Sequence, residues 1–250
     1  METKRKGLSA RTLKWWGLVL TLLWVLGRTM TRILLRGASG EALLTQLEAV
    51  PYMMGAATAI LILESLAVCA VPIYAALLLE GVSHTQDMKQ YVLRVGLLAL
   101  VSEIPYDLLM TGKFLDFSVQ NPLLGLVVCQ AVVYFWNRCA EPGMKSTLIR
   151  AAVILAAAAW CLMLRVEYGL PMLLCTAILW MFRKDRSKWG LGGMMGAAVS
   201  ILLSPFFLAA PMGAILLHFY NGQRGEGGRG LFYIAYPLLL LAGAAAAMIF

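Results

Sequence analysis

Charged side chains make up only 14% of the 250 residues, and acidic ones are rarer still, with 13 Asp and Glu in total. Hydrophobic residues make up 61% of the chain, whereas a soluble domain is about 45–50% apolar and about 25% charged. A soluble core of this size cannot bury so much apolar surface, so lipid must be the solvent for most of the chain. This excludes a disordered chain, a soluble enzyme and a DNA-binding domain, and we expect no nucleic-acid partner.

Several motifs are also missing. The five cysteines form no CxxC pair, so the sequence predicts neither a metal site nor a disulfide framework. The Gly-rich stretch 221–230 lacks the preceding strand and the GK[ST] ending of a phosphate-binding loop, and we interpret it as a connector. The sequence contains no internal repeat, so we expect one integral membrane domain over residues 1–250.

Apolar runs separated by polar breaks predict an all-α, polytopic bundle of about eight or nine transmembrane helices. The candidate spans lie near residues 15–35, 58–82, 91–111, 121–136, 148–164, 169–182, 189–203, 206–220 and 231–249. The stretch 49–82 is ambiguous, because one helix of that length would be about 50 Å long. It is either two spans or one span preceded by an interfacial or re-entrant piece.

The distribution of basic residues predicts the orientation. The first 14 residues are basic, and we interpret them as the cytoplasmic start of an uncleaved signal anchor. With one crossing in 49–82, 16 of the 21 Lys and Arg lie in cytoplasmic regions, as the positive-inside rule requires. These regions are 1–14, 83–94, 137–150, 183–188 and 221–230. A second crossing would place the four cations of 183–188 outside, so the sequence favours one crossing.

Ionisable residues inside a span cost about 2.5–3.5 kcal/mol each at its centre, so each one points to a pairing or functional role. Glu80 and His84 are four residues apart and share a helix face. A carboxylate beside an imidazole orients the ring for general-base chemistry. The alternative is a solvated helix end with a chance pairing.

Two further groups of charges lie at membrane depth. Glu103 and Asp107 share a face around Pro105, and they either position a substrate or belong to a buried ion-pair network with nearby arginines. Arg28, Arg32 and Arg36 form a stripe at four-residue intervals. The stripe either binds phosphates of a nucleotide-bearing cofactor or lipid, or extends towards outer headgroups.

Several stretches resemble the TraX family of bacterial membrane proteins. The most specific are LLLEGVSHT and SEIPYDL within residues 72–108, and QNPLLGL, EYGLPMLL, FRK, YNGQRG and FYIAYPL follow in the family's order. The matching positions are Glu80, Gly81, His84, Thr85, Arg94, Glu103, Pro105, Asp107, Asn121, Glu167, Tyr168, Gly169, Asn221, Gly222 and Pro237.

The resemblance implies a multi-pass inner-membrane protein similar to membrane acyltransferases and to the protein that acetylates the N-terminus of conjugative pilin. The donor would be acetyl-CoA, and the acceptor an amine or hydroxyl of a protein N-terminus, a lipid or a glycan. Trp24 and Val25 replace an Asp-His pair that the family usually has in its first span. Leu239 stands where the family has a histidine, and Gly125 where it has a threonine.

We therefore expect a membrane acyltransferase with its donor site facing the cytoplasm. His84 is the expected base and Glu80 its orienting partner, while Glu103 and Asp107 position the acceptor. The expected cofactor-binding residues are Arg94, Arg28, Arg32 and Asn121. The alternatives are a catalytically silent protein that binds a lipid or protein partner, which the missing Asp-His pair favours, and a proton-coupled transporter.

Overall fold

The computed structural model describes residues 7–35, 45, 50–139, 141–225 and 230–249, and every regular element in these residues is helical. The predicted all-α class is therefore confirmed for the described part of the chain. The elements are α1 Ala10–Met30, η1 Thr31–Leu35, α3 Pro51–Ala67, α4 Ala70–His84, α5 Met88–Met110, α6 Pro122–Arg138, α7 Met144–Met163, α8 Gly169–Met181, η2 Arg186–Lys188, α9 Trp189–Ile201, η3 Pro205–Ala209, α10 Ala210–His218 and α11 Gly230–Ile249.

Local sequence explains where several of these helices begin. Ser9, Asp87 and Asn121 each accept a hydrogen bond from a backbone N–H in the first turn of α1, α5 and α6. Such caps satisfy donors that have no partner within the helix. Pro51 and Pro122 occupy first-turn positions, where the missing N–H of proline costs nothing.

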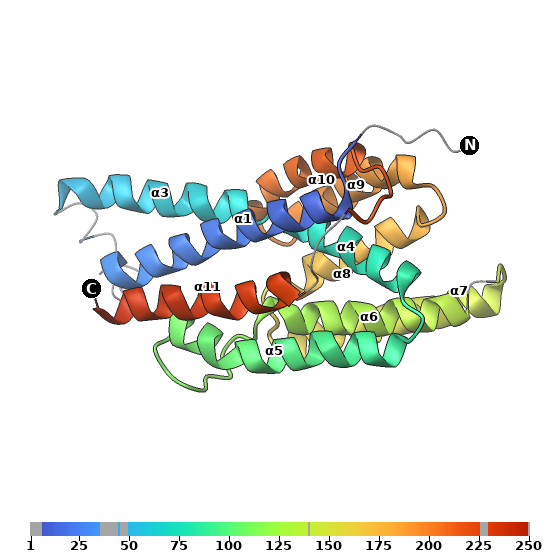
Figure 1. Ribbon diagram of the computed structural model, residues 1–250, viewed down its shortest axis with the longest axis horizontal. Helices are drawn as coiled ribbons and strands as arrows, with labels where there is room; N and C mark the ends of the chain where they lie inside the picture. Colours follow the sequence, from blue (N-terminus) through green and yellow to red (C-terminus); the bar gives the residue numbers. More distant parts are fainter. Residues whose placement is uncertain (1–6, 36–44, 46–49, 140, 226–229, 250) are drawn as a thin grey trace.

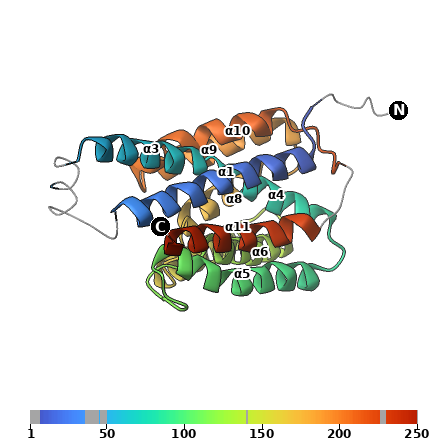
Figure 2. The same cartoon turned by 60° about the vertical axis from the view of Figure 1, so that its left-hand side comes forward.

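The bundle has two distinct ends (Figure 1). Helices α1, α5, α7, α9 and α11 begin at one of them. We call it the basic end, because the connection from α8 to α9 carries Arg183, Lys184, Arg186 and Lys188. In both views α3 and α4 follow one another in a single direction along the bundle, with a break at Val68 and Cys69 (Figures 1 and 2). This arrangement agrees with one crossing of the ambiguous stretch.

Within the described residues, four helical stretches are long and apolar enough to cross a membrane: Ala10–Leu34, Pro51–His84, Met144–Met163 and Gly230–Ile249. Each exceeds or approaches the roughly 20 residues that a span requires. The molecule is therefore a multi-pass helical membrane protein. The larger count of eight or nine spans stays a prediction.

Three predicted spans form helices shorter than the sequence indicated. Helices α8 and α9 have 13 residues each and α10 has nine, so the longest is about 20 Å against a hydrocarbon thickness of about 30 Å. Helices α9 and α10 form a hairpin whose turn, η3, packs against α3. The hairpin extends only part of the way along the bundle, and α3 occupies the remaining length (Figure 2).

The chain just before α6 and the chain just before α8 both lie within the bundle and are hydrogen-bonded to each other there. Gln120 N donates to Arg165 O at 3.1 Å, and Glu167 N donates to Gln120 O at 2.9 Å. The neighbouring Asn121 donates to the carbonyl of Ala99, about halfway along α5. Backbone without helical hydrogen bonds is tolerated at such depth only where protein or a polar cavity surrounds it. These segments therefore mark the polar interior of the bundle.

Close helix contact at Gly213 joins α10 to α4, and it supports a stability prediction. A methyl group on Gly213 would overlap the backbone carbonyl of Cys69. We expect Gly213→Ala to lower the free energy of unfolding by about 1–3 kcal/mol, the usual cost of overpacking. The matched control is Gly96→Ala on α5, where nothing lies within 4 Å of the added carbon. It should be neutral or stabilising, because alanine favours helix; equal melting temperatures for the two variants in detergent would contradict the expectation.

Candidate functional site

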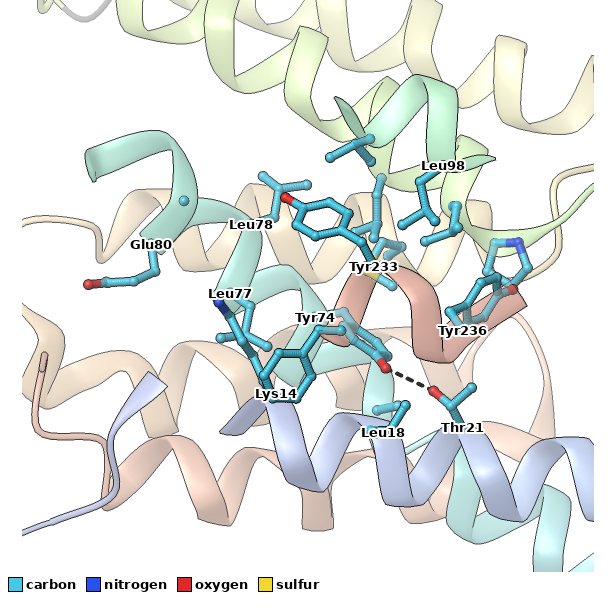
Figure 3. Close-up of a pocket in the computed structure, with 18 of the residues that line it drawn as sticks. Lys14, Leu18, Thr21, Tyr74, Leu77, Leu78, Glu80, Leu98, Tyr233 and Tyr236 are labelled. Atoms are coloured by element: carbon cyan, nitrogen blue, oxygen red, sulfur yellow. Dashed lines mark hydrogen bonds between the residues drawn. The ribbon is translucent and has the colours of Figure 1, made fainter. Parts of the chain in front are cut away.

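A cavity of about 430 Å³ lies between α1, α4, α5 and α11. Its walls are largely apolar, with Leu77 and Leu98 among the residues that line it (Figure 3). It extends from the basic end, where Thr85 lines it, to the middle of the bundle, where Trp24 and Tyr168 line it. The cavity is therefore a pocket that enters the bundle from the basic end.

Aromatic hydroxyl groups surround the inner part of this cavity. Tyr74 Oη and Thr21 Oγ1 are hydrogen-bonded at 2.8 Å (Figure 3). Trp24 Nε1 donates to Tyr168 Oη at 3.1 Å. The hydroxyl of Tyr236 is buried and has no hydrogen-bond partner among the described residues. A buried polar atom without a partner is costly, so Tyr236 offers a binding position to a polar ligand group.

Positive charge gathers where the cavity meets the basic end. Lys14 from α1, Arg94 from α5 and Arg224 from the connection before α11 all line it, together with His84. We call these four residues the mouth of the cavity. Lys14 also lies over the ring of Phe232, with 5.7 Å between Nζ and the ring centroid. The arrangement suits an anionic group that remains at the surface while an apolar arm enters the cavity.

The predicted pair of Glu80 and His84 lies at this mouth, at the end of α4. His84 Nδ1 lies 3.0 Å from the backbone carbonyl oxygen of Glu80 and 3.3 Å from its carboxylate Oε1. Both of these atoms accept hydrogen bonds, so we assign the ring hydrogen to Nδ1. That tautomer leaves the lone pair of Nε2 available to take a proton.

Arg186 is a third member of this cluster that sequence reasoning missed. Its Nη2 lies 3.0 Å from Glu80 Oε2. Tyr220 lies beside it and stacks on Trp189 with 5.7 Å between ring centroids. Burial raises the pKa of the Tyr220 phenol, and the nearby Glu80 carboxylate adds to the rise. The sequence feature that points to Arg186 is the basic run 183–188, but the sequence does not indicate which of these cations turns inward.

Arg28 does not line the cavity with Arg94 but belongs to a separate buried ion cluster. Its guanidinium lies 2.7 Å from Glu167 Oε1 and 3.5 Å from Glu64 Oε1. Tyr106 Oη donates to the other oxygen of Glu167 at 2.8 Å. The arginine thus pairs with two carboxylates within the bundle, Glu64 and Glu167, rather than with Glu103 or Asp107, for which the sequence suggested arginine partners.

Arg32 also lies away from the mouth of the cavity. Its guanidinium donates to the carbonyl oxygens of Leu108 and Leu109 near the end of α5. Cations at a helix C-terminus satisfy carbonyls that have no partner within the helix. Arg36, the third member of the predicted stripe, lies outside the described residues.

Glu103, Asp107 and Asn121 form a further polar group that holds the loop 111–121 in place. The Asn121 side chain donates to Glu103 Oε2 and to the carbonyl of Ala99. Asp107 Oδ2 accepts from the backbone N–H of Asp116 at 2.8 Å. None of the three lines the cavity that His84 lines. The structure therefore brings Glu80, His84 and Arg94 together and keeps Glu103, Asp107 and Asn121 apart from them.

The signature segment YNGQRG, residues 220–225, is hydrogen-bonded to the residues that precede and begin α1. Asn221 N donates to Leu8 O and Asn221 Nδ2 donates to Gly7 O, both at 3.0 Å. Ala10 N donates to Gln223 O at 2.8 Å. These bonds hold the start of α1 against the connection that carries Arg224.

Fold and site together define a multi-pass helical membrane protein with a polar-mouthed cavity that opens at its basic end. Residues 43–244 match the family described as TraX protein, and the chain belongs to this family. Neither the curated proteins nor the solved structures contain a match to the chain.

Proposed function

We propose that this protein is a membrane acyltransferase that moves an acetyl group from acetyl-CoA to an amine or hydroxyl of a membrane-associated acceptor. The observation that carries the proposal is His84, whose Nδ1 is fixed by Glu80 at the wall of a cavity with a cationic mouth. The chain belongs to the TraX family, and the proposed chemistry is what the resemblance of that family to membrane acyltransferases implies. The mouth would face the cytoplasm of the inner membrane.

The donor suits this cavity in charge and shape. Its nucleotide carries phosphates, which Lys14 and Arg224 would hold at the mouth. Its thioester arm is long and mostly uncharged, and it would follow the apolar wall at Leu77 and Leu98. The donor would thus bring a reactive carbonyl into the same space that His84 lines.

The transfer proceeds by nucleophilic attack within this space. His84 Nε2 takes a proton from the acceptor amine or hydroxyl as its nitrogen or oxygen attacks the thioester carbonyl carbon. A bond from that atom to carbon forms, and the carbonyl oxygen becomes negatively charged and is stabilised by the nearby cations. The carbon–sulfur bond then breaks, and the thiolate that leaves receives the proton from His84. Glu80 acts through His84 as a positioning residue.

A catalytically silent relative is the competing proposal. Trp24 and Val25 fill the first-span positions where the family usually has its Asp-His pair, so Val25 stands in place of the histidine. Both are buried, and Trp24 Nε1 donates to Tyr168 Oη. If that family histidine is indispensable, the cavity would bind a ligand without turning it over. The buried acids also permit a third proposal, a proton-coupled transporter. For such a protein we expect Glu103→Gln to abolish proton-coupled uptake.

Two measurements on the purified protein separate these proposals. We expect labelled acetyl-CoA to transfer its label to an acceptor amine or hydroxyl, and coenzyme A at 100 times its Kd to stabilise the protein by about 2.7 kcal/mol. Stabilisation without transfer to any protein, lipid or glycan acceptor would favour the silent relative. Absence of both would remove the acyltransferase proposal.

A further inference from the structure

An open groove of about 440 Å³ follows the outside of the bundle between α5 and α11. Its α5 wall presents Leu97 and Val101, and its α11 wall presents Ile234 and Leu238. These four side chains are between 52% and 62% exposed. A continuous apolar groove on the outer face of a membrane protein suits a hydrocarbon chain.

Arg94 is the only charged residue among those described that line this groove. It lies six residues into α5, about 9 Å from the start of the helix, and therefore towards the basic end of the groove. Its guanidinium donates to Gln90 Oε1 at 3.1 Å, and no described carboxylate oxygen lies within 4 Å of it. The cation is therefore available to a phosphate that stands above the apolar groove.

The groove and the cavity share a boundary. Arg94, Leu98 and Tyr233 line both of them. A headgroup attached to a phosphate at Arg94 thus lies at the edge of the space that His84 lines. Helix α11 also contains Pro237 at this groove, and a proline within a helix removes one backbone hydrogen bond and permits a bend.

We propose that this groove binds a glycerophospholipid of the leaflet at the basic end, with its acyl chain between α5 and α11 and its phosphate on Arg94, and that its headgroup amine or hydroxyl is the acetyl acceptor. The acceptor role rests on the proposed acyltransferase function, whereas the binding of the lipid does not. The assignment gives the donor phosphates to Lys14 and Arg224 and the acceptor phosphate to Arg94. The acetyl group forms an amide or ester with the headgroup, the thioester carbon–sulfur bond breaks, and the proton passes through His84 to the thiolate.

Binding is tested with photoactivatable phosphatidylethanolamine in vesicles that contain the full-length protein. We expect crosslinks on α5 and α11 and at least a fivefold lower yield for Arg94→Gln, while Lys89→Gln on the same helix keeps the wild-type yield. Leu97→Trp should reduce the yield by filling the groove, and Leu100→Trp, an exposed position outside it, should not. Equal yields for each variant and its control would overturn the proposal.

The donor assignment is tested with the same variants. We expect Arg94→Gln to bind coenzyme A within twofold of wild type, and Lys14→Gln and Arg224→Gln to bind it at least fivefold more weakly. If Arg94→Gln loses coenzyme A affinity but keeps its lipid crosslinks, the lipid role of Arg94 is wrong and its predicted donor role stands.

The acceptor role is tested by transfer of labelled acetyl groups in vesicles of two compositions. Label should enter phosphatidylethanolamine, which has a free amine, and not phosphatidylcholine, which has the same phosphate and no group to acylate. If both lipids crosslink and a peptide amine is acetylated while phosphatidylethanolamine is not, the acceptor inference fails and the acyltransferase proposal survives. If no acceptor of any class is acetylated, the acyltransferase proposal fails, although the groove still binds lipid.

Discussion

Arg28→Met should lower the free energy of unfolding by about 3–5 kcal/mol, the usual cost of removing one partner of a buried ion pair. The arginine side chain is 26% exposed, and its partners Glu64 and Glu167 are 15% and 10% exposed. Without it, two carboxylates would stand in the bundle with no cation. The measurement is unfolding in mixed micelles with increasing denaturing detergent.

Two companion variants show whether charge is the cause. Arg32→Met removes a cation whose hydrogen bonds within the described residues go to carbonyl oxygens, so we expect a smaller loss of about 1–2 kcal/mol. Adding Glu167→Gln to Arg28→Met should restore part of the lost stability, because one uncompensated charge disappears. If Arg28→Met lies within 1 kcal/mol of wild type, the cluster does not hold the fold together.

The effect of Arg28 should extend to the cavity. Glu167 immediately precedes Tyr168, which lines the cavity and has a left-handed backbone conformation with φ of 56°. Gly169 follows at the start of α8, packed against Cys161. The ion cluster therefore fixes the segment that forms the inner wall of the cavity, and this links membrane-depth charge to the geometry of the site.

Much of this architecture is predictable from sequence because the bilayer imposes a simple length rule. All nine predicted apolar runs correspond to described helices, and the Glu80–His84 pair follows from spacing on one helix face. The break after α3 was not predicted, nor was the nine-residue length of α10 within the predicted span 206–220. Hydropathy measures how apolar a run is, and short helices enclosed by other helices are as apolar as spans.

The partners of the buried charges could not be predicted. Arg28 is 36 residues from Glu64 and 139 from Glu167 in the chain, and these contacts depend on how α1, α3 and the loop before α8 pack. The same holds for Glu80 and Arg186, which are 106 residues apart. Within one helix, spacing determines which side chains meet; between helices, only the tertiary packing does.

The return of the chain to the middle of α5 at Asn121, after the loop 111–118, was also missed, and it changes the meaning of three predicted residues. A polar loop after a span is normally expected at the surface. Most of residues 111–118 are indeed exposed, but the loop is anchored at both ends by buried side chains, with Asp107 2% exposed and Asn121 fully buried. Their place in the TraX signature therefore has a structural explanation, and it does not require that they touch an acceptor.

The second large effect concerns catalysis. We expect His84→Gln to lower kcat for acetyl transfer by about 10²- to 10⁴-fold, the range in which a positioned general base contributes. Its affinity for coenzyme A should stay within twofold of wild type, since the histidine acts on the acceptor proton. His218→Gln is the matched control, because His218 is exposed at the end of α10 and does not line the cavity. That variant should keep full activity.

Chemical rescue separates a base from a structural residue. Imidazole added to His84→Ala should restore part of the transfer rate, because a free imidazole can occupy the vacated space and accept the proton. Glu80→Gln should retain more activity than His84→Gln but lose stability, since Arg186 then keeps its charge beside a neutral partner. If His84→Gln transfers acetyl groups at the wild-type rate, proton removal must come from another group, and the cationic mouth would serve to bind the donor alone.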